Sequence, residues 1–145
     1  MDYTLLPSAD PALNKLASAK ASSIGKGVSG TITNAGTITV WTPASGKSFV
    51  VHGWDIKVLI TTTLGASSTG FTIGLYDASV SDANLVAGIT LLRGASPAGE
   101  LYTGHVENCY FKSAAANQAL ILGPHTSLGA TNAIRVAGTV WGAEV

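Results

Sequence analysis

Cysteine and charged residues are both scarce in this 145-residue chain. Cys109 is the single cysteine, so no disulfide within the chain can hold the fold together. Only 11% of the residues are charged, and eight basic residues balance eight acidic ones. A protein that binds nucleic acid by neutralising phosphates carries a basic excess or cluster, so we expect no nucleic-acid partner.

Long apolar runs are lacking as well. No stretch approaches the roughly 20 apolar residues that a membrane-spanning helix requires. The residues that follow Asp2 do not form the apolar segment of a signal peptide. We therefore expect a protein that is made in a cytoplasm and has no membrane partner.

The chain is rich in apolar residues, which make up 46% of it, and it contains 17 glycines. From Gly30 onward, short segments of alternating apolar and polar residues are separated by Gly, Pro, Ser and Asn turns. The expected strands cover residues 38–40, 49–60, 71–77, 85–92, 101–111, 119–122 and 134–141. This spacing predicts an all-β fold, a jelly-roll-like antiparallel β-sandwich of about eight strands over residues 30–145.

The longest predicted strand, residues 49–60, is the expected centre of the sandwich. Every second residue is apolar or aromatic, which places Val50, Trp54, Ile56 and Val58 in the core. His52 and Ile60 share this predicted inner face.

Residues 1–29 have a different composition and are predicted to form an N-terminal arm. Asp10 and Pro11 are a good N-cap and first-turn pair, so the arm is expected to be extended with one short helix. Its leucines lack the alternation of a strand. We expect these leucines, which are Leu5, Leu6, Leu13 and Leu16, to contact a partner protein or a neighbouring subunit.

Candidate catalytic and metal-binding residues do not form a recognisable motif. His105 and Glu107 share a strand face, and Asp55 and Glu107 lie on the two longest strands, where they could be neighbours. A metal site needs three or four converging ligands, and nothing in the pattern brings His52 or His125 to His105. We therefore predict no metal, no cofactor, no catalytic residue and no enzymatic activity.

A phosphate-binding loop is also excluded by its context. Residues 46–48, Gly-Lys-Ser, match the end of that motif, but Trp41 stands where its first glycine belongs. A β-branched run follows in place of the required helix.

Several aromatic residues leave a sugar-binding role open. A large ring in a sandwich is usually part of the core or of a subunit contact, but exposed rings can also stack on sugars. The candidates are Trp41, Trp54, Tyr76, Tyr102, Tyr110 and Trp141.

The segment from Gly30 to Gly53, and above all its turn Trp41-Thr-Pro-Ala-Ser-Gly-Lys47, resembles small bacteriophage virion proteins. These include capsid decoration (cement) proteins and some fibre and tail components. The resemblance implies a jelly-roll subunit without catalytic residues, usually a homotrimer, bound to the major capsid protein on the capsid exterior and made in the host cytoplasm. The alternative is a receptor- or glycan-binding domain of a head or tail fibre.

Overall fold

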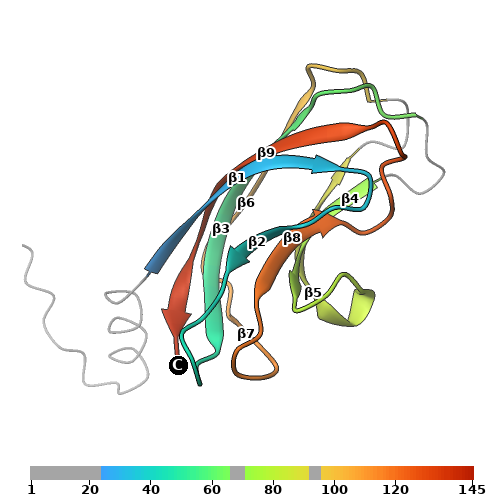
Figure 1. Cartoon of the computed structure of the whole chain (residues 1–145). Coiled ribbons are helices and arrows are strands. Elements are labelled where there is room, and N and C mark those ends of the chain that lie inside the picture. The colour runs from blue at the N-terminus through green and yellow to red at the C-terminus, as the bar shows by residue number, and fades with distance from the viewer. Residues whose placement is uncertain (1–23, 66–70, 92–95) are drawn as a thin grey trace, which may run out of the picture.

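The computed structural model describes residues 24–65, 71–91 and 96–145 as an antiparallel β-sandwich (Figure 1). Four strands and a short fifth form the first sheet, in the order β1-β9-β3-β6 with β7 paired to β3, and four form the second sheet, in the order β2-β8-β4-β5. The strands are β1 Ile24–Thr33, β2 Ile38–Trp41, β3 Phe49–Ile60, β4 Phe71–Asp77, β5 Leu85–Leu91, β6 Leu101–Val106, β7 Phe111–Lys112, β8 Leu120–Pro124 and β9 Ala133–Glu144. A short 3₁₀ helix, η1 (Asp82–Asn84), precedes β5. The predicted all-β sandwich is confirmed.

The strand order is that of a jelly roll. The strand pairs are those of one long hairpin that has its turn between β4 and β5. β4 pairs with β5, β3 with β6, β2 with β8 and β1 with β9, and all four pairs are antiparallel. Additional pairs, β3 with β9 and β4 with β8, complete the two sheets. Rolling such a hairpin gives two Greek keys and brings strands from both ends of the chain together.

β3 is one of the two inner strands of the first sheet, and the face that it turns inward changes partway along the strand. Trp54 is 4% exposed, and Ile56 and Val58 are fully buried beside it. A β-bulge between Val51 and Gly53, opposite β9, reverses the alternation. Before the bulge, Phe49 and Val51 belong to the inner hydrophobic cluster.

The prediction that Val50 and His52 share the inner face of Trp54 is therefore wrong. Val50 is buried but lies outside the inner cluster, and His52 stacks on the exposed ring of Tyr110. The sequence pattern of residues 49–60 contains no feature that marks the bulge.

The predicted boundary between arm and sandwich at Gly30 falls inside a strand. β1 begins at Ile24 and pairs with β9 over its whole length without a register shift. Gly25, Gly27 and Gly30 belong to this strand. Gly30 has a packing role, because a Cβ there would lie 2.7 Å from Cδ1 of Ile38. The four arm leucines, Leu5, Leu6, Leu13 and Leu16, lie outside the described residues.

The strand predicted over residues 101–111 is interrupted. β6 ends at Val106 and β7 begins at Phe111. Between them Asn108 has a left-handed backbone with φ of 57°, a conformation that asparagine tolerates better than most residues. The Cys109 N–H donates to the carbonyl oxygen of His52, so the interruption lies directly beside the bulge of β3.

Candidate functional site

The strands of the second sheet carry almost no charge, although Asp82 of η1 lies next to His125, which stacks on Tyr76 beside this sheet. Asp77 is the one charged residue in β2, β8, β4 and β5. It is only 4% exposed, and it accepts hydrogen bonds from the Ser113 hydroxyl and the Ala114 N–H, each at 2.8 Å. We call the outer side of this sheet the uncharged face, and it includes Thr39, Thr72, Gly74, Tyr76, Ile121 and Gly123.

A row of glycines crosses the uncharged face, and neighbouring side chains occupy the space over it. Gly88, Gly74 and Gly123 are direct neighbours across β5, β4 and β8. Two side chains fill the space above Gly74, where a Cβ would lie 2.7 Å from Cδ1 of Leu85 and 2.8 Å from the hydroxyl of Tyr76. The Tyr76 ring therefore lies over the sheet, and burial, assisted by the charge of Asp82, raises the pKa of its hydroxyl.

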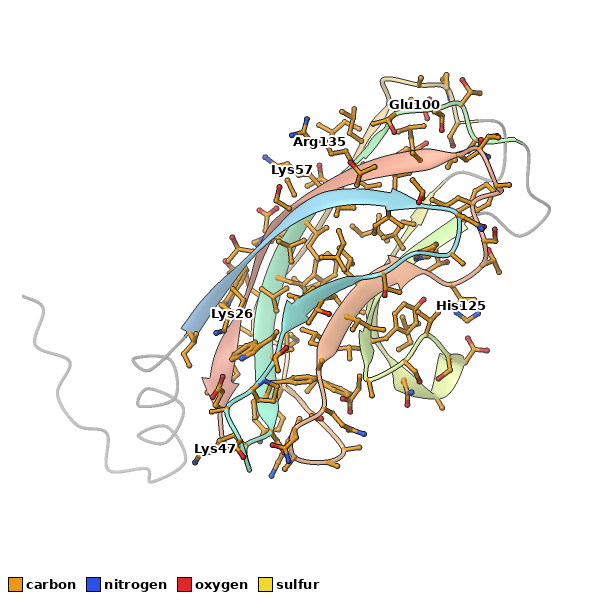
Figure 2. The ribbon with its side chains drawn as sticks, in the orientation of Figure 1. Lys26, Lys47, Lys57, Glu100, His125 and Arg135 are labelled. Atoms are coloured by element: carbon orange, nitrogen blue, oxygen red, sulfur yellow. The ribbon has the colours of Figure 1, made fainter. Side chains whose placement is uncertain are left out.

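The outer face of the first sheet differs, because charged side chains line its strands. By the alternation of β3 and β9, Asp55, Lys57 and Arg135 point outward there, together with His105 of β6. Figure 2 shows Lys57 and Arg135 on this side of the sandwich, whereas His125 lies beside the second sheet. We call this side the charged face.

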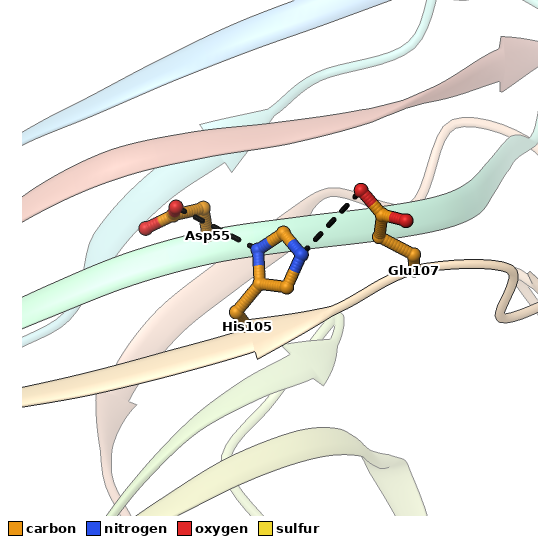
Figure 3. A network of polar contacts seen from close by, with 3 residues as sticks. All are labelled: Asp55, His105 and Glu107. Atoms are coloured by element: carbon orange, nitrogen blue, oxygen red, sulfur yellow. Dashed lines mark ion pairs between the residues drawn. The ribbon is translucent and has the colours of Figure 1, made fainter.

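A histidine between two carboxylates lies on the charged face (Figure 3). Nδ1 of His105 is 3.6 Å from Oδ2 of Asp55, and Nε2 is 3.5 Å from Oε1 of Glu107. The side chains of His105, Asp55 and Glu107 are 50%, 45% and 66% exposed. The predicted closeness of Asp55 and Glu107 is thus realised through His105, which is directly opposite Asp55 in the pairing of β3 with β6.

The other two histidines lie elsewhere. His52 stacks on Tyr110, and His125 stacks on Tyr76 with its Nε2 3.4 Å from Oδ1 of Asp82. Within the part of the chain that the structure describes, no group of three or more His, Cys, Asp or Glu side chains could hold a metal ion. The same part contains no helix that is long and apolar enough to cross a membrane.

The aromatic residues considered for sugar stacking do not gather into one platform. Trp41, Trp54 and Tyr76 are buried, while Tyr102 and Trp141 are half-buried. Tyr110 is 75% exposed and stands by itself against His52. Trp141 is the one ring of this set that lies close to the group around His105, with ring centroids 6.1 Å apart.

The residues of the Trp41–Lys47 turn are held by the opposite end of the chain. Glu144 in β9 accepts hydrogen bonds from the indole N–H of Trp41 at 2.8 Å and from the Ala44 N–H at 3.1 Å. Nζ of Lys26 lies 5.4 Å from the centre of the Trp41 ring. Sequence reasoning missed this cluster, because its members are about 100 residues apart and meet only once β9 lies beside β3.

The structure also shows the surroundings of the Gly46–Lys47 turn and of Cys109, the single cysteine. The turn at Gly46 and Lys47 leads into β3 and not into a helix, and the Gly46 N–H donates to the side-chain oxygen of Asn117. Cys109 is half-buried, and burial raises the pKa of its thiol, which lowers the fraction of reactive thiolate.

No protein-family model matches the chain, and no curated protein matches it either. Among solved structures, the chain is similar to one described as a cyanophage Pam1 capsid asymmetric unit, with 16% identity, 84% of each chain covered and a TM-score of 0.33. A similarity this low leaves the function to be argued from the chain's own surfaces.

Proposed function

We propose that this chain is a bacteriophage capsid decoration protein that binds the outer surface of the assembled head and stabilises it. The uncharged face is the observation that carries this proposal. Its exposed and half-buried side chains, which are those of Thr39, Thr72, Leu85 and Ile121, are uncharged, and the one charged residue of its four strands, Asp77, is buried. The sequence resemblance of the Gly30–Gly53 segment to virion proteins supports the same function.

The chemistry of the uncharged face suits a protein partner. The centres of protein interfaces are depleted in charged residues, because each unpaired charge that loses its water raises the free energy of the complex. Leu85 is 39% exposed at the edge of this face and adds apolar area. A partner that binds only the assembled shell stabilises the shell by linkage, which requires no catalytic group. We assign the major capsid protein as this partner and the charged face as the side turned to solvent.

The same proposal includes self-association and the N-terminal arm. From the resemblance, we expect a homotrimer in solution, which native mass spectrometry measures directly. The arm leucines Leu5, Leu6, Leu13 and Leu16 are proposed as additional contacts to the shell or to a neighbouring subunit. Because β1 begins at Ile24, a chain that starts at Ser23 keeps every described strand. We expect this truncation to melt like the full chain yet to bind undecorated heads more weakly.

The copy number in purified virus particles separates decoration from the alternative, a receptor- or glycan-binding domain of a head or tail fibre. Fibres and tails are present in a few to tens of copies, whereas a protein that covers the lattice is present in hundreds. Quantitative mass spectrometry of the particles, with the major capsid protein as internal standard, gives this number. Hundreds of copies support decoration, and a few to tens contradict it.

A further inference from the structure

Trp141 lies on the charged face, so its side chain is not part of the hydrophobic core. Val136 and Val140 of β9 are in the inner cluster, so alternation turns Trp141 outward. The indole lies across Gly53, where a Cβ would be 2.4 Å from Cζ2 of the ring. On its other side the paired residue is Gly25 of β1, which has no side chain. The ring is thus seated on backbone and has no β1 side chain beside it.

Hydrogen-bonding groups lie beside this ring. The imidazole of His105 is tilted by 44° to the indole at 6.1 Å, and Asp55 and Glu107 lie on either side of the imidazole. The separations of 3.5–3.6 Å are longer than ordinary hydrogen bonds, so both carboxylates retain free acceptor positions. All three side chains are about half exposed, so a ligand can reach them.

We propose that Trp141, His105, Asp55 and Glu107 form a binding site for a neutral pyranose oligosaccharide. The apolar C–H face of a pyranose packs on an aromatic ring, while its hydroxyls donate to carboxylates and bond to an imidazole. Two carboxylates disfavour an anionic sugar by charge repulsion. This site goes beyond capsid binding and does not depend on it, because it lies on the opposite side of the sandwich from the uncharged face.

The three tryptophans allow a direct measurement with the full chain. In a ¹⁵N-labelled sample each indole N–H gives its own NMR signal, and Trp141→Phe identifies the signal of Trp141. The probes are maltotriose, cellotriose and triacetylchitotriose. We expect at least one of them to shift the Trp141 signal in a saturable way, with a dissociation constant on the order of millimolar. The signals of the buried Trp41 and Trp54 should move much less.

Two isosteric variants test the two carboxylates of the proposed site. Asp55→Asn and Glu107→Gln should each weaken binding by about three- to tenfold, because a charged acceptor is replaced by a neutral amide. Asp82→Asn, beside the second sheet, is the matched control and should bind like the parent. The proposal is overturned if no probe shifts the Trp141 signal at about 20 mM, a concentration well above the expected constant. It is also overturned if the double variant Asp55→Asn/Glu107→Gln binds with parental affinity.

Discussion

The two outer faces of the sandwich differ, whereas the two inner faces are alike. Both sheets turn aliphatic and aromatic residues inward to one shared core. Outward, the first sheet carries Asp55, Lys57, His105 and Arg135, while the second sheet carries glycines, threonines and Ile121. A hydrophobic core requires only that its apolar side chains are buried and pack closely together, so its composition says little about function. The outer faces have no such requirement, so the difference in charge between them is the better guide to what each one contacts.

The first prediction compares the inner and outer sides of one sheet. Trp54→Ala should lower the free energy of unfolding by about 3–5 kcal/mol, because it empties a buried site. Trp141→Ala should cost about 1–2 kcal/mol, since that ring is already partly in solvent. Urea unfolding followed by circular dichroism measures both values. Equal losses would show that Trp141 is part of the structural core and not a free outer ring.

The second prediction compares glycines of the two sheets. Gly74→Ala should cost about 1–3 kcal/mol, because its Cβ would press on Leu85 and Tyr76. Gly27→Ala in β1 meets nothing within 4 Å, so it should be neutral or stabilise by up to about 1 kcal/mol through reduced freedom of the unfolded chain. Thermal melting of the two variants distinguishes them. A neutral Gly74→Ala would mean that the Tyr76 ring does not rest on the second sheet.

The third prediction concerns pH and Glu144, at the end of the first sheet. The Trp41 indole N–H, the Ala44 N–H and the charges of Lys26 and Lys47 hold the pKa of Glu144 below its ordinary value of 4.5. A lowered pKa in the folded state contributes stability above the ordinary value and loses it as the pH falls through the folded value. The melting temperature of the parent should therefore exceed that of Glu144→Gln near neutral pH, and the gap should narrow below pH 4.5. Parallel curves from pH 7 to about pH 3 would contradict this assignment.

The strands themselves were predictable, because alternation is a local property of the sequence. The segments around Val58, Ile73 and Val136 alternate clearly, and each is a strand in the structure. The jelly-roll fold class could be predicted from the number and spacing of such segments, whereas the pairing order of the strands could not. The bulge beside Gly53 was not predictable, since its cause is the pairing with β9, which is some 90 residues away.

Of the two candidate surfaces, only the group around His105 could be predicted in part from the sequence. Asp55, His105 and Glu107 were singled out from the sequence, because two long strands placed them on corresponding faces. Trp141 could be named but not located, as its neighbours Gly53 and Gly25 belong to other strands. The uncharged face was missed altogether. Its strands can be compared for charge only after they are known to share a sheet, and local patterns do not assign strands to sheets.

One matched pair of variants tests the central claim, that the uncharged face binds the capsid. Thr39 and Thr103 are both exposed strand threonines, one in the second sheet and one in the first. We measure the binding of each Thr→Glu variant to virus heads that lack this protein, by co-sedimentation over a range of concentrations. Thr39→Glu should weaken binding by about tenfold or more, because it buries an unpaired charge, and Thr103→Glu should bind like the parent. Equal binding by the two variants, or loss confined to Thr103→Glu, would contradict the proposed orientation.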